Sequence, residues 1–294
     1  MNNKFRKILA LSALSLLMCN IGLAQDVKFG IKGGENISSL MAGDNNTPVS
    51  EGYKSLMTKG GGIFTELQIN PTVSLRLGVE YIGMGGKKDG MQAIPSQRLI
   101  TEMGNSIGMS ITEQQLAALG ALAMNMPPYY YANVDNTVKL DYVMIPLMAQ
   151  FGKNIGQSSW RVYINAGPFV SFLMSGKQES KGTSKMFADA SGTQTLWEKL
   201  NQPIKDMVAS EFPSIESTLD NPATFGKTNI TGELKSSNFG VTGNAGIRYQ
   251  CRKNYLFIEA GGNYGFATVQ DNNTNGSNRT GAVSVMIGYS FSLF

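Results

Sequence analysis

The most informative absence in this sequence is histidine, which does not occur once in 294 residues. Without it the chain has no Ser–His or Cys–His pair to activate a nucleophile, and it lacks the commonest metal ligand of proteins. Lipid hydrolases that depend on a histidine base are therefore excluded. We expect a protein that is not an enzyme and holds no metal or other cofactor.

Long hydrophobic runs are also scarce, and the clearest one lies at the start of the chain. Lys4, Arg6 and Lys7 precede the apolar segment 8–17, and the small residues Gly22 and Ala24 follow it. This order is typical of a secretory signal peptide. We predict that residues 1–24 are the signal and that 25–294 form the mature protein. A lipoprotein signal ending at Cys19 is the alternative, but the bulky Met18 disfavours it.

Cysteine and net charge are low in the mature chain. Cys251 is the only cysteine after residue 24, so no internal disulfide can form. The sequence has 25 basic and 21 acidic residues, and three basic but no acidic ones lie in the signal, which leaves a net charge of +1. Such a chain has no global positive field to attract nucleic acid, so we expect no nucleic-acid partner.

After the signal, no segment approaches the roughly 20 apolar residues of a membrane-spanning helix. Instead, eight segments alternate between apolar and polar residues, as expected of strands with one lipid-facing side. A membrane protein built from strands must close into a barrel, because hydrocarbon cannot satisfy an open sheet edge. The segments are 27–32, 63–69, 73–81, 138–151, 160–171, 239–249, 256–264 and 283–291.

Connections between these segments alternate between short and long, which is the pattern of periplasmic turns and outer loops. The longest are 85–136 and 175–235. The sequence thus predicts an all-β fold, an eight-stranded antiparallel transmembrane β-barrel in the outer membrane, in contact with its lipid and with two long, partly helical extracellular loops. Within the fourth segment, Asp141 to Val143 interrupt the alternation and predict a bulge. Six aromatic residues near segment ends predict girdles at the membrane surfaces: Tyr81, Tyr142, Trp160, Tyr249, Tyr264 and Tyr289.

Several segments, taken in order, resemble the PorT-like outer-membrane β-barrel family of Bacteroidota. They include Phe29-Gly30-Ile31-Lys32-Gly33-Gly34, segment 140–147, Ala166-Gly167-Pro168-Phe169, segments 239–241, 246–249, 257–260 and 263–265, and Gly288-Tyr289-Ser290-Phe291. The resemblance covers most strands and little of the two long loops. It implies a barrel of this type and no single function. Met144 and Gly261 stand where the family often has glutamate and arginine.

Charged residues at inward positions of the segments predict a group of side chains within the lumen. Charges enclosed in a narrow barrel must pair, and an eight-stranded barrel is just wide enough for side chains to fill it. We therefore expect a structural charge ladder, and the alternatives are a conduction path or a carboxylate site. The residues are Glu66, Arg76, Glu80, Arg161, Arg248 and Glu259.

Both long loops carry the start signal of a helix. Thr112 with Gln115 and Thr195 with Glu198 have the spacing of capping boxes. Pro203 should kink or split the second helix. The apolar residues after each start either pack together as a cap or form a binding surface for a protein or glycan partner. They are Leu116, Leu119, Leu122, Met126, Trp197, Leu200 and Met207.

Two functions are consistent with these features. The first is a non-enzymatic surface protein, in which a barrel with a plugged lumen presents its loops for binding or for a structural role. The second is a narrow channel or an accessory of a transport or secretion system.

Overall fold

We analysed a computed structural model that describes residues 26–43, 47–107, 111–272 and 275–293. The predicted signal peptide, residues 1–24, lies outside the described residues. Within them, no helix is both long and apolar enough to cross a membrane, a finding that does not bear on crossing by strands.

The described chain closes into an eight-stranded antiparallel barrel, as predicted. Each strand pairs with its neighbours in the chain, and β1 pairs with β13 while β6 pairs with β7, so no barrel strand is left as a free edge. The barrel strands are β1 (Val27–Ala42), β2 (Leu56–Gln68), β3 (Val73–Lys88), β6 (Asp135–Asn154), β7 (Trp160–Lys181), β11 (Ser237–Cys251), β12 (Asn254–Gly265) and β13 (Asn278–Ser292).

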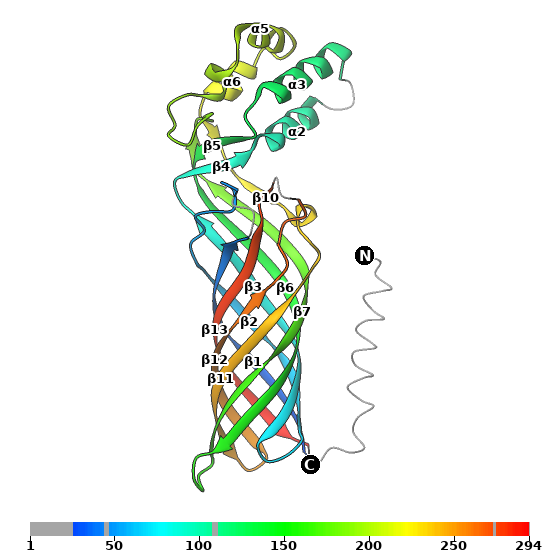
Figure 1. Cartoon of the computed structure of the whole chain (residues 1–294), viewed down its shortest axis with the longest axis vertical. Coiled ribbons are helices and arrows are strands. Elements are labelled where there is room, and N and C mark those ends of the chain that lie inside the picture. Colours follow the sequence, from blue (N-terminus) through cyan, green and yellow to red (C-terminus); the bar gives the residue numbers. More distant parts are fainter. Residues whose placement is uncertain (1–25, 44–46, 108–110, 273–274, 294) are drawn as a thin grey trace.

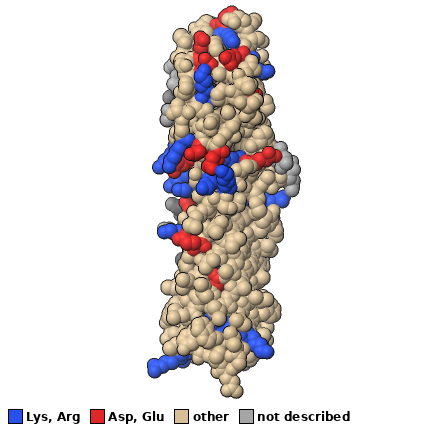
Figure 2. Space-filling model, turned by 90° about the vertical axis from the view of Figure 1, so that its left-hand side faces the viewer, with Lys and Arg blue, Asp and Glu red and all other residues tan. Residues whose placement is uncertain are grey.

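The predicted facing of the strands agrees with the structure. Ile31, Ile63 and Ile287 point outward and are 59%, 62% and 65% exposed, whereas Arg76 and Glu66 point inward and are almost completely buried. Figure 2 shows the same division on one face, where the barrel wall carries few charged side chains between its two ends. This apolar belt has the character of the lipid-facing wall that the sequence predicts.

The two barrel ends differ in their connections. One end, here the turn end, carries the short connections β2–β3, β6–β7 and β11–β12, and the barrel's first and last strands begin and end there (Figure 1). The opposite end, here the cap end, carries the long connections and a helical cap above the barrel mouth (Figure 1).

Strands at the cap end are longer than the sequence predicted. Loop 85–136 was expected to begin at Gly85, but β3 continues to Lys88 and pairs there with Asn136 of β6. Loop 175–235 was expected to begin at Ser175, but β7 continues to Lys181. The lipid-facing alternation stops before the strands do, because hydrogen-bonded pairing continues above the belt without apolar outward residues.

The bulge predicted in the fourth strand is present. The register between β6 and β7 shifts between Asp141 and Tyr142. Tyr142, however, was expected in an aromatic girdle, and this prediction is wrong: its side chain is buried inside the barrel, since even-numbered residues of β6 face the lumen. Tyr81, Trp160, Tyr249 and Tyr289 do face outward.

The cap is built from the two longest connections. The first contributes β4 (Met91–Pro95), α2 (Ser96–Ile107), α3 (Glu113–Asn125) and β5 (Tyr129–Asn133). The second contributes β8 (Thr183–Ser184), α4 (Leu196–Lys199), α5 (Gln202–Glu211), α6 (Ile215–Asp220), β9 (Ala223–Thr224), β10 (Lys227–Asn229) and the short 3₁₀ helix η1 (Thr231–Glu233). Strands β4 and β5 pair with each other, as do β8 and β9, while β10 adds to the upper end of β7.

Local sequence explains where these helices begin and break. Thr112 caps α3 and Thr195 caps α4, each through the reciprocal side-chain and backbone bonds of a capping box. The predicted split also occurs: α4 ends at Lys199, and α5 begins with Pro203 in its first turn, where the missing N–H group leaves no bond unmade.

Candidate functional site: barrel interior, barrel mouth and cap

Six buried side chains near the turn end form a continuous chain of ion pairs whose charges alternate in sign. Glu80 and Glu259 both lie against Lys32, with Oε1–Nζ distances of 2.9 and 3.0 Å. On the other side of Glu259, its Oε2 accepts a hydrogen bond of 2.8 Å from Arg76 Nη1.

The chain continues from Arg76 to a second arginine. Arg76 Nη2 lies 3.5 Å from Glu66 Oε2. Glu66 also accepts two bonds from Arg248, of 3.0 Å at Oε1 and 2.6 Å at Oε2. Three cations and three carboxylates therefore balance across strands β1, β2, β3, β11 and β12, and the lumen group as a whole is neutral.

Aromatic rings surround the central arginine. The guanidinium carbon of Arg76 lies 4.4 Å from the ring centre of Phe64 and 5.7 Å from that of Phe257. Inward glycines make room for these rings, because a Cβ at Gly30 would overlap Phe64 and a Cβ at Gly288 would overlap Phe257. Arg76 is thus held by cation–π contacts as well as by its carboxylates.

Five of the six lumen residues predicted from the sequence meet in this chain: Glu66, Arg76, Glu80, Arg248 and Glu259. The sixth, Arg161, lies nearer the turn end, where its Nη1 contacts Asn154 Oδ1 at 3.4 Å. Lys32 was predicted to face inward but was not counted as part of the ladder. The alternation of β1 could have identified Lys32 as a member of the ladder, since it lies in the same inward row as Lys28.

Above the ion pairs, towards the cap end, the lumen becomes apolar along β3 and β6. Inward residues of β3 change from Arg76 and Glu80 to Ile82 and Met84, which face Tyr142 and Leu140 of β6. Leu234, just after η1, and Val269, from the β12–β13 connection, extend the same cluster at the barrel mouth.

Most of the loop residues predicted as a binding surface are buried in the cap. Helices α3 and α5 pack against each other, and Leu122, Met126, Trp197 and Leu200 belong to one hydrophobic core. Leu119 is buried as well, and Met207 packs against the core from outside. Of the seven, Leu116 is the one that stays open, with 61% of its surface exposed. Five of the other six are buried and Met207 is half-buried, because the apolar spacing that first singled them out places them on the core side.

A free apolar face remains on α3. Leu116 and Met124 are exposed, Met124 by 88%, and the exposed residues between them are alanines. No charged residue occurs from Gln114 to Val134. Isolated exposed apolar residues are ordinary, but a series of exposed apolar residues along one helix, whose single charged residue is Glu113 in its first turn, suits contact with another protein.

Elsewhere in the cap, a loop before α4 is held by a carboxylate. Asp189 accepts bonds from the hydroxyl of Ser191 and from the backbone N–H groups of Thr193 and Gln194. The Ser191 hydroxyl, followed by those backbone donors, lowers the pKa of Asp189 below its usual range. The loop is therefore most stable with this carboxylate charged.

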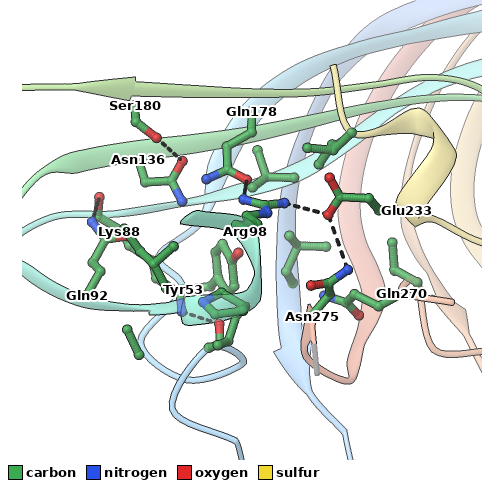
Figure 3. Close-up of a pocket in the computed structure, with 18 of the residues that line it drawn as sticks. Tyr53, Lys88, Gln92, Arg98, Asn136, Gln178, Ser180, Glu233, Gln270 and Asn275 are labelled. Carbon is green, nitrogen blue, oxygen red and sulfur yellow. Dashed lines mark hydrogen bonds and ion pairs between the residues drawn. The ribbon is translucent and has the colours of Figure 1, made fainter. Parts of the chain in front are cut away.

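A small cavity of about 60 Å³ lies where the cap meets the barrel mouth (Figure 3). On one side of it Arg98 of α2 donates to Glu233 of η1 at 2.6 Å and to Gln178 of β7 at 3.2 Å. Figure 3 shows Lys88 and Tyr53 on the opposite side. Residues of both long connections and of β1, β3, β6 and β7 meet here, so the cavity marks the contact of cap and barrel.

A wider, more open polar hollow of about 520 Å³ lies at the turn end. Glu66 and Arg248, the last members of the ion-pair chain, line its floor, and Arg161 and Lys153 line its walls. The turn end is therefore open down to the ion pairs.

Comparison of the sequence with models of known protein families finds a match to one family. The model of the family described as "Outer membrane protein beta-barrel domain" matches residues 23–271. A search of curated proteins finds no match.

Solved structures with a similar trace share little sequence with this chain. Neisserial surface protein A (NspA) is 11% identical, with 90% of this chain and 96% of that chain covered and a TM-score of 0.34. Ail, the attachment invasion locus protein of Yersinia pestis, is 11% identical, with coverages of 91% and 100% and a TM-score of 0.34. The outer membrane protein OprG from Pseudomonas aeruginosa is 11% identical, with coverages of 90% and 95% and a TM-score of 0.33. These scores carry no argument about function.

Proposed function

This chain belongs to the family of outer membrane protein β-barrel domains, and we propose that it is a non-enzymatic membrane anchor with a plugged lumen, which holds a folded cap at the cell surface. The protein resides in the outer membrane, and its barrel wall is the part that meets lipid. The cap would face outward, since the barrel's first and last strands begin and end at the opposite end.

The chain of ion pairs with alternating charge is the main support for a plugged lumen. Each carboxylate in it lies against a cation, and the aromatic rings fill space around Arg76. An ion crossing the barrel would have to separate these pairs in a medium of low dielectric, where an unpaired charge costs several kcal/mol. It would then have to pass the apolar cluster around Leu140 and Ile82.

The same pairing supports a role without catalysis. Glu66 and Glu259 are the most deeply buried lumen carboxylates, and both are bound to guanidinium groups. A carboxylate that serves as general acid or base needs an oxygen that can reach the substrate, whereas both oxygens of Glu66 and of Glu259 accept from cationic side chains.

The exposed face of α3 supports partner binding by the cap. Leu116 and Met124 offer apolar surface on a helix whose single charged residue is Glu113, which favours a protein partner over a glycan. The remaining predicted loop residues would act indirectly, by giving the cap a rigid core that fixes α3.

The resemblance to PorT-like barrels leads us to propose that the chain belongs to that group within the wider family. The residues at 29–34, 140–147 and 288–291 support this assignment.

Removal of the cap tests the anchor. Residues 90–133 and 183–226 would be replaced by short Gly/Asn turns, leaving the pairs Lys88–Asn136 and Asp135–Lys181 to close the strands. We expect a barrel that inserts into the outer membrane but no longer co-purifies with partners, because loop connections contribute little once strands are paired. In the full chain, the double variant Leu116→Ser, Met124→Ser should lose partner binding while the cap and the barrel stay folded. A capless barrel that retains all partners would contradict the proposal.

Single-channel recording separates the anchor from the alternative of a narrow channel or transport accessory. The purified protein in a planar bilayer should show no conductance. Steady conductance from the wild-type protein would instead support a path through the lumen.

A further inference from the structure

The cavity between cap and barrel contains one cation that its lining does not neutralise. Among the described residues, three charged ones line it: Lys88, Arg98 and Glu233. Arg98 and Glu233 form an ion pair of 2.6 Å, so their charges cancel. Lys88 remains, and the described part of the lining therefore carries one positive charge.

Lys88 is deeply buried and has few partners. Its side chain is 7% exposed, and its Nζ donates to the carbonyl oxygen of Val49 and lies 4.2 Å from the ring centre of Tyr53. No carboxylate in the part of the chain that the structure describes lies within 4 Å of this ammonium group; Glu51, the acidic residue that acts on it electrostatically, is exposed.

The Tyr53 ring does not supply the missing negative charge. Desolvation raises the pKa of the Tyr53 hydroxyl to about 12, so the phenol stays neutral near pH 7. An ammonium group has three N–H donors. The Val49 carbonyl and the Tyr53 ring are both neutral, so neither gives Lys88 a negatively charged acceptor.

The rest of the lining can bind oxygen atoms. Asn136 brings the Nδ2 of its amide, and Val134 and Ile94 bring apolar surface, whereas Gln92, Ser180 and Gln270 already donate to neighbouring groups of the chain. From these observations we propose that the cavity is a binding site for a small monocarboxylate anion, whose carboxylate pairs with Lys88.

Size and charge select this class of ligand. A volume of about 60 Å³ gives room for the equivalent of about four water molecules, which fits an acid of a few heavy atoms. The single uncompensated charge matches one carboxylate better than a doubly charged phosphate. The apolar residues suit a short carbon chain.

Titration calorimetry on the full-length protein in detergent tests the proposal, with acetate and acetamide as probes. The two have nearly the same shape, and only acetate carries charge. We expect saturable binding of acetate and none of acetamide. Inorganic phosphate should bind more weakly than acetate.

Variants locate the site. Lys88→Met removes the charge and keeps the apolar stem, and it should weaken acetate binding by about tenfold or more, equivalent to about 1.4 kcal/mol. Lys88→Arg should retain binding. Lys87→Met is the matched control, because Lys87 is the neighbouring residue on the exposed side of β3, and it should bind acetate as the wild type does. Heat-modifiable gel migration confirms that each variant is folded.

Four results would overturn the proposal: no saturable acetate binding, equal binding of acetamide, tighter binding of phosphate, or unchanged acetate binding in Lys88→Met.

Discussion

Arg76 of β3 and Glu259 of β12 meet inside the barrel, with Nη1 and Oε2 2.8 Å apart and both side chains almost completely buried. They are 183 positions apart in the chain. Glu259 also accepts from Lys32 and from the Tyr163 hydroxyl, so side chains of three strands, β1, β3 and β7, converge on a carboxylate of a fourth, β12. This contact joins opposite parts of the barrel wall through its centre.

Arg76→Met should destabilise the barrel by about 3–5 kcal/mol, because it leaves Glu259 and Glu66 buried without one of their cations. The measurement is the urea midpoint of unfolding in detergent, followed by the loss of heat-modifiable migration. Lys253→Met, in an exposed turn, is the control and should change stability by less than about 0.5 kcal/mol.

Replacing both partners should cost less than the two single changes together. Arg76→Met combined with Glu259→Gln removes one cation and one carboxylate, and the remaining group stays neutral. Additive losses in the double variant would show that the two side chains stabilise the barrel independently.

Ile287→Arg should destabilise insertion by about 2–4 kcal/mol if this residue meets the bilayer midplane. Ile287 is 65% exposed at the middle of β13, where it pairs with Gly33 and Ile258. Gln114→Arg, on the exposed surface of α3, should be tolerated. Equal tolerance at both positions, measured by folding into lipid vesicles, would mean that β13 does not face lipid at Ile287.

Leu122→Ala should destabilise the cap by about 2–5 kcal/mol, because the side chain is fully buried in the cap core. The cap should then be cleaved rapidly by protease, whereas the barrel stays heat-modifiable. Leu116→Ala, on the exposed face of the same helix, serves as the comparison. If Leu116→Ala loosens the cap as much as Leu122→Ala does, the helix is oriented differently.

Acid should loosen the cap through Asp189. The pKa of this carboxyl is lower in the folded cap than in the unfolded chain, so its stabilising effect is complete above about pH 4 and is lost as pH falls through the folded pKa. Fluorescence of Trp197 in a Trp160→Phe background reports on the cap core, since the chain has two tryptophans. Asp189→Asn should show a weaker acid transition; an unchanged transition would assign it to other groups.

The sequence identified most of the lumen group but not its exact membership. Alternation placed Arg76, Glu80 and Glu259 on the inward side, and the structure brings them together. Arg161 has the same inward phase but lies nearer the turn end, while Lys32 takes its place among the ion pairs. The phase of a strand determines whether a side chain points into the lumen or out of the barrel. The stagger between strands determines which inward side chains lie at the same height along the barrel axis.

By itself, the sequence determined the barrel, the phases of its strands apart from that of β6, the bulge after Asp141 and the helix starts at Thr112 and Thr195. Each of these depends on neighbouring residues: a two-residue period, or a capping pair three positions apart. The tertiary structure alone decided that Tyr142 points into the lumen, that Trp197 and Leu122 share one core, and that Lys88 lines the cavity between cap and barrel. Those features depend on strand stagger and on contacts between distant segments, which no local pattern in the chain records.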